Sequence, residues 1–161
     1  ARPKRTAVRI VIAALAAIAV QPLVAIARAL PDLVLSGQPS QGFGLFVLSV
    51  LLFAAIFVFA LGVPVFLLLR KFRATGRATL AIAGFVLSAW PVVLLSWPDA
   101  DHTSGSTWNG EYVEKYVDGE PTRYAWFIFA TQLANAGVHG LVGALVFRAA
   151  WRRTGQRAMS G

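Results

Sequence analysis

Residues 124–151 read YAWFIFATQLANAGVHGLVGALVFRAAW, with no acidic residue and a single basic residue, Arg148. A helix of this length is long enough to cross the hydrocarbon core of a bilayer. At about 100° per residue, Gln132, Asn135 and His139 share one face with small residues, whereas the opposite face is apolar. Polar side chains are costly in hydrocarbon, so we expect this polar face to pack against other helices of a bundle.

The whole chain has the composition of a membrane protein. Hydrophobic residues make up 57% and charged residues 14%, whereas about 25% of the residues in soluble domains are charged. The net charge of +8 comes from short basic clusters beside apolar runs, which indicate membrane topology and not a nucleic-acid surface. The absence of cysteine excludes disulfides, thiolate metal sites and cysteine nucleophiles. Abundant Ala, Arg, Gly and Val are typical of a GC-rich bacterial genome.

These runs predict an all-α integral membrane protein, in which one domain forms a four-transmembrane-helix bundle with an acidic extracytoplasmic loop between helices 3 and 4. The expected spans lie near 7–29, 43–70, 78–97 and 124–150. Prolines and glycines between the first two spans predict a short loop over 28–41. Pro22 and Pro64 remove backbone donors inside the spans and predict local bends, and Pro91 leaves the Leu87 carbonyl free.

The first apolar run has two interpretations. A basic start, an apolar middle and Ala25-Ile26-Ala27 are the ingredients of a cleavable signal peptide. We expect a retained transmembrane helix instead. Its small residues would let a neighbouring helix approach closely; they are Ala13, Ala14, Ala16 and Ala17.

The uneven distribution of charge predicts the orientation. Basic residues cluster before residue 10, in the turn 70–77 and after residue 147, whereas the acidic residues lie in 28–41 and 98–123. Under the positive-inside rule, both termini are expected in the cytoplasm and segment 98–123 outside it, in a multi-pass protein of the bacterial cytoplasmic (inner) membrane.

Segment 98–123 is the long, acidic, aromatic-bearing region between the spans. Its β-forming residues precede Asp118-Gly119, a favourable type I′ turn pair, so we expect a short hairpin there, with a mobile loop as the alternative. The residues expected to contact a protein partner are Trp108, Glu111, Tyr112, Glu114, Tyr116, Asp118 and Glu120.

The polar face of the last span is the expected place for a small-molecule site. The candidate residues are Gln132, Asn135, His139, Ser88 and Gln21. Gln21 and Gln132 are expected at similar depth, where they can bond across helices, and a neutral His139 is expected to donate to Ser88 or another group. His102 lies in a loop, so a bis-histidine haem or metal pair inside the bundle is excluded.

No catalytic constellation is present in the sequence. The spans hold no carboxylate, which disfavours proton-coupled exporters, and phosphate-loop, zinc-protease and serine-hydrolase motifs are missing. We therefore expect no enzyme, metal or cofactor. The first hypothesis is an interaction protein, an accessory subunit or an immunity-type protein, that presents its acidic loop to another membrane or periplasmic protein. The alternative is binding or transport of a lipid, quinone or solute at the polar face.

Overall fold

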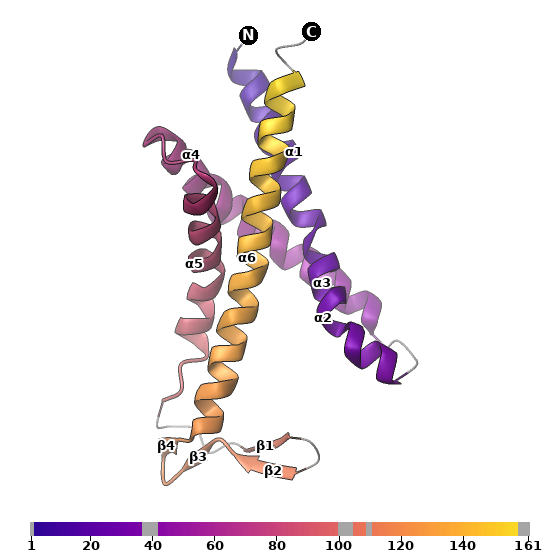
Figure 1. Ribbon diagram of the computed structural model, residues 1–161, viewed down its shortest axis with the longest axis vertical. Coiled ribbons are helices and arrows are strands. Elements are labelled where there is room, and N and C mark those ends of the chain that lie inside the picture. The colour runs from indigo at the N-terminus through magenta and orange to yellow at the C-terminus, as the bar shows by residue number, and fades with distance from the viewer. Residues whose placement is uncertain (1, 37–41, 100–104, 109–110, 158–161) are drawn as a thin grey trace.

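The computed structural model of the chain describes residues 2–36, 42–99, 105–108 and 111–157. Within them, four helical segments are long and apolar enough to cross a membrane: Thr6–Arg28, Phe43–Lys71, Arg77–Leu95 and Arg123–Gln156. Figure 1 shows the start of the first segment, the end of the last segment and the turn between the second and third segments at one end of the bundle, called here the terminal end. The strands lie at the opposite end, the hairpin end.

The first segment is divided into α1 (Arg2–Ala19) and α2 (Gln21–Ser36). Pro22 has no N–H to donate to the Ile18 carbonyl, and it stands in the first turn of α2, where this loss costs little. Backbone bonds from Val20 to Ala16 (3.3 Å) and from Val24 to Val20 (3.2 Å) carry the helix across the break. The break lets α2 diverge from α6 toward the hairpin end (Figure 1).

The loop expected over 28–41 is wrong in its first part, because α2 continues to Ser36. Pro31 is the one helix-breaking residue of that segment that lies inside the helix, and a single proline removes only one backbone bond. Gly37 and Pro39, the other breakers, fall outside the described residues.

The second segment consists of α3 (Phe43–Phe57), the π-helix η1 (Val58–Gly62) and α4 (Val63–Lys71). The wider turn accommodates Pro64 at the start of α4, and the Val63 N–H donates to the Val58 carbonyl, five residues back. The bend expected near Pro64 therefore takes the form of a π-helical turn. Figure 1 shows this segment running obliquely past α6.

Helices α5 (Arg77–Leu95) and α6 (Arg123–Arg157) form the closest helix pair. A Cβ added at Gly84 would overlap the Gly140 carbonyl, and one added at Gly140 would overlap the Gly84 carbonyl and the Ser88 hydroxyl. Small residues at these positions let the two backbones approach closely. The buried core continues toward the terminal end, where alanines of α1 meet aromatic and aliphatic side chains: Ala13, Ala14, Ala17, Phe66, Leu80 and Phe147.

The segment between α5 and α6 contains two antiparallel ladders. Strands β1 (Gly105–Trp108) and β2 (Glu111–Glu114) pair with Trp108 opposite Glu111, and β3 (Tyr116–Val117) and β4 (Glu120–Pro121) pair with Val117 opposite Glu120. The Asp118-Gly119 turn joins β3 to β4, with φ values of 50° and 81° that suit a type I′ turn. The β-forming residues that precede this turn are divided between the two ladders, in β2 and β3.

Candidate functional site: a cleft between the second helix segment and the bundle

A cleft of about 540 Å³ lies between the α3–η1–α4 segment and helices α1, α2, α5 and α6. It exists because the second segment leans across the others and has little contact with them. Its 18-residue apolar window contains no buried residue. The side chains on its inner face line the cleft, whereas Leu48, Leu52 and Ile56 on its outer face are exposed.

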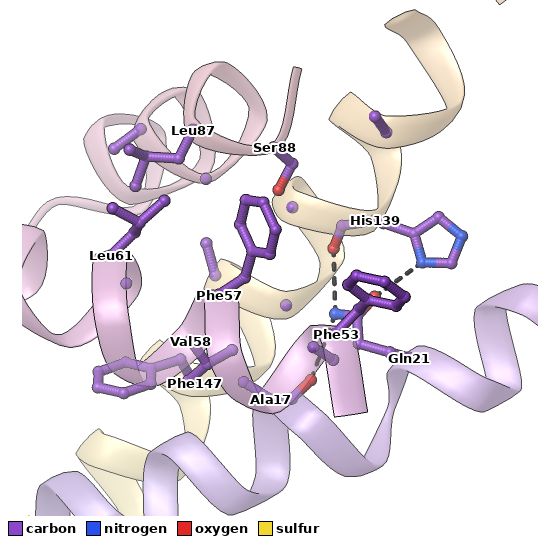
Figure 2. Close-up of a pocket in the computed structure, with 18 of the residues that line it drawn as sticks. Ala17, Gln21, Phe53, Phe57, Val58, Leu61, Leu87, Ser88, His139 and Phe147 are labelled. Carbon is purple, nitrogen blue, oxygen red and sulfur yellow. Dashed lines mark hydrogen bonds between the residues drawn. The ribbon is translucent and has the colours of Figure 1, made fainter. Parts of the chain in front are cut away.

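The lining is mainly aromatic and aliphatic. Figure 2 shows Phe53, Phe57 and Leu61 of the second segment together with Leu87 of α5 and Phe147 of α6. The π-helical turn also contributes, since Val58, Leu61 and Gly62 all line the cleft. The polar residues of the lining are Gln21, Ser49, Ser88 and His139.

Gln21 and His139 form a hydrogen-bonded pair at one edge of the cleft (Figure 2). The Gln21 side chain is buried, at 7% exposure. Its Nε2 donates to the carbonyls of Ala17 (3.3 Å) and His139 (3.2 Å), and its Oε1 lies 2.8 Å from His139 Nδ1. Gln21 therefore bonds both its own helix and α6.

This arrangement determines the histidine tautomer. Both amide hydrogens of Gln21 point to carbonyl oxygens, so its Oε1 is the atom that faces the ring and His139 Nδ1 must carry the proton. The reversed amide would place Oε1 against two carbonyl oxygens, which is repulsive. Neutral His139 then keeps a lone pair on Nε2.

The structure brings together three of the five residues expected at the intramembrane site: Gln21, Ser88 and His139 line the cleft. The inward position expected for Gln132 is wrong, because its side chain is exposed. Gln132 belongs to the half of α6 nearer the hairpin end, where α2 has diverged from α6 (Figure 1). Asn135 is half-buried and does not line the cleft.

The hydrogen bonds expected from Gln21 and from His139 to other helices are both replaced by bonds between these two residues. Gln21 bonds His139 instead of Gln132, and His139 bonds Gln21 instead of Ser88. Ser88 instead lies against Gly140 in the α5–α6 contact. Ser49 donates to the Leu45 carbonyl of its own helix at 2.8 Å. The polar groups of the lining thus serve mainly to hold helices.

A cationic and aromatic cluster at the terminal end was missed by the sequence analysis. The Arg9 guanidinium carbon lies 4.1 Å from the centroid of the Trp151 ring, and that of Arg70 lies 5.3 Å from it. Arg9 Nη2 also donates to the Trp151 carbonyl at 2.9 Å. These residues come from three helices, and no local sequence pattern connects them.

The residues expected to bind a protein partner lie at the hairpin end. Tyr112, Glu114, Asp118 and Glu120 have exposed side chains, and Tyr116 is half-buried. Trp108 and Glu111 face each other in the β1–β2 register, and their side chains lie outside the described part of the chain.

The lining of the cleft offers apolar surface and a few hydrogen-bonding side chains. No group of three or more His, Cys, Asp or Glu side chains that could hold a metal occurs among the described residues. The chain matches no protein-family model, no curated protein and no solved structure. The site must therefore be interpreted from its own geometry.

Proposed function

We propose that this protein binds an amphiphilic small molecule of the membrane, whose apolar part occupies the cleft beneath α3 and η1. The observation that carries the proposal is the cleft itself. Its volume of about 540 Å³ falls within the range of about 300–1,000 Å³ that is usual for small-molecule sites. Its lining of Phe53, Phe57 and Leu61 suits a hydrocarbon chain or an apolar ring.

The polar side chains of the lining favour an apolar ligand over a polar solute. The Gln21 amide hydrogens and the His139 Nδ1–H are used within the protein, so a polar solute that needs these donors would have to break existing bonds, one of them to α6. Breaking them would leave buried polar groups unsatisfied, which is costly. An apolar ligand leaves the network intact.

The test compares two identical substitutions on α5. Leu87→Trp places an indole inside the cleft, whereas Leu94→Trp places it on a surface with 62% exposure that does not line the cleft. Native mass spectrometry of detergent-purified protein is expected to find co-purified lipid on the parent and on Leu94→Trp, and much less on Leu87→Trp. Equal retention by both variants, or none by the parent, would refute the proposal.

A second candidate function is recognition of a protein partner at the hairpin end. Tyr112 is 70% exposed and Val117 48%, and both stand beside the exposed carboxylates of Glu114 and Asp118. Exposed aromatic and apolar side chains next to acidic ones are a suitable surface for a basic partner. Pull-down from native membranes should lose the partner with Glu114→Lys and keep it with Gln156→Lys, which adds a lysine at an exposed site near the terminal end. Recovery of no specific protein would refute this candidate.

We infer from the positive-inside rule that the terminal end of the bundle faces the cytoplasm. The support is the basic turn around Arg70, Lys71 and Arg73 at that end, opposite the acidic hairpins (Figure 1).

A further inference from the structure

Two arginines lie close to one indole ring at the terminal end. The guanidinium carbons of Arg9 and Arg70 are 4.1 Å and 5.3 Å from the Trp151 centroid. The Arg9 Nη2–Trp151 carbonyl bond fixes the first guanidinium, and Arg9 Nε is buried with no bonding partner among the described residues. Two positive charges are therefore held near one ring.

No carboxylate balances this pair within the described part of the chain. The acidic residues described there stand toward the hairpin end, in α2, after α5 and in the strands (Figure 1). Two neighbouring cations repel each other unless an anion lies near them. A phosphate group suits this position, because arginine binds phosphate through paired N–H donors.

The arginine pair adjoins one end of the cleft. The Phe66 ring lies 5.2 Å from the Trp151 ring and 4.7 Å from the Phe147 ring, and both phenylalanines line the cleft. Leu69, which precedes Arg70, lines it as well. Phe66 and Leu69 thus connect the apolar cleft to the arginine pair, and this order of apolar and cationic groups matches the polarity of an amphiphile.

We propose that the cleft takes an anionic phospholipid from the leaflet at the terminal end, with its phosphate on Arg9 and Arg70 and an acyl chain along Phe66 and the π-helical turn. This assignment rests on the proposed function, which it deepens by naming the head group. Basic pockets between transmembrane helices bind anionic head groups in this way.

The experiment uses the full chain in mixed micelles with phosphatidylglycerol and phosphatidylethanolamine of matched acyl chains. Native mass spectrometry gives the ratio of the two lipids retained. The parent protein is expected to enrich the anionic lipid, and Arg70→Gln to lower the enrichment by about fivefold. Arg70 is suitable because it is exposed, whereas Arg9 also bonds the Trp151 carbonyl. Arg152→Gln removes an equal charge from an exposed site at the same end and should retain the enrichment.

Other results of this experiment would overturn the head-group assignment, the assigned site or the proposed function. Retention of lipid by the parent without preference would overturn the head-group assignment and leave the proposed function intact. Failure to retain any lipid would overturn both. Equal losses for Arg70→Gln and Arg152→Gln would indicate general surface charge and overturn the assigned site. Displacement of the anionic lipid by millimolar inorganic phosphate would overturn the lipid as the source of the phosphate. Circular dichroism of each variant checks that its helices are intact.

Discussion

Gln21 and His139 bond each other twice, although 118 residues separate them in the sequence: Gln21 Nε2 donates to the His139 carbonyl at 3.2 Å, and His139 Nδ1 donates to Gln21 Oε1 at 2.8 Å. The contact lies just after the break at Val20, where α2 begins to diverge from α6. A side chain at this point holds the two helices at the last position where they still meet.

The Gln21–His139 pair should show measurable coupling. A double-mutant cycle of Gln21→Leu and His139→Leu is expected to give an interaction free energy of about 0.6–2 kcal/mol, the range for hydrogen bonds between membrane helices. Unfolding in a denaturing detergent provides the stabilities. Gln132→Leu is the matched control and should be nearly neutral, because Gln132 is exposed. Additive single effects within error would contradict the interpretation.

The α5–α6 contact predicts a sharp difference between two glycines. Gly140→Ala would place a methyl group against the Gly84 backbone, and overpacking of this kind costs about 1–3 kcal/mol. Gly44→Ala meets nothing within 4 Å and should be neutral or slightly stabilising, since alanine favours a helix over glycine. The same detergent unfolding assay measures both. Equal stability of the two variants would argue against the close approach of the helices.

The sequence was sufficient to predict the helical segments, because their apolar runs are long enough to cross a bilayer. It was also sufficient to predict the departures from a regular α-helix beside Pro22 and Pro64, because a proline has no N–H to donate to the preceding turn. It did not predict which side chains meet. Gln132 and Gln21 were expected at the same depth, but Gln21 lies level with His139, about two turns of α6 nearer the terminal end than Gln132.

The cleft and the arginine cluster depend on the angle at which helices cross. Phe53 and Phe57 line the cleft because the second segment leans across the other helices. Arg9, Arg70 and Trp151 belong to three helices, so no local sequence pattern connects them. A crossing angle is a property of many weak contacts, so no motif encodes it.

Thr122 should determine how firmly the hairpins are joined to α6. Its Oγ1 lies 3.0 Å from the carbonyls of Glu114 and Lys115, and it accepts a bond from the Ala125 N–H at 3.4 Å as the cap of the helix. Thr122→Ala is expected to cost about 0.5–2 kcal/mol locally, the usual value for a lost N-cap.

Hydrogen exchange of the β3–β4 segment and of the first turn of α6 measures this effect. Thr131→Ala provides the control, because the Thr131 hydroxyl bonds only the Phe127 carbonyl of its own helix in the described contacts. If exchange at β3 and β4 is unchanged in Thr122→Ala, the threonine does not join the two elements.

The orientation of the protein follows from charge and can be tested by cysteine labelling, since the chain has no native cysteine. We expect Ser36→Cys and Ser106→Cys to react with a membrane-impermeant maleimide in intact cells. Thr75→Cys and Ser160→Cys should react only after the membrane is opened. The physical reason is that moving the arginines around 70–77 across the bilayer is disfavoured, whereas acidic residues contribute little to topology. Thr75 is the decisive position, because it lies in the short turn between the second span, which ends at Lys71, and the third, which begins at Arg77. Labelling of Thr75→Cys in intact cells would refute this orientation and would also place the Arg9–Arg70 pair on the outer leaflet.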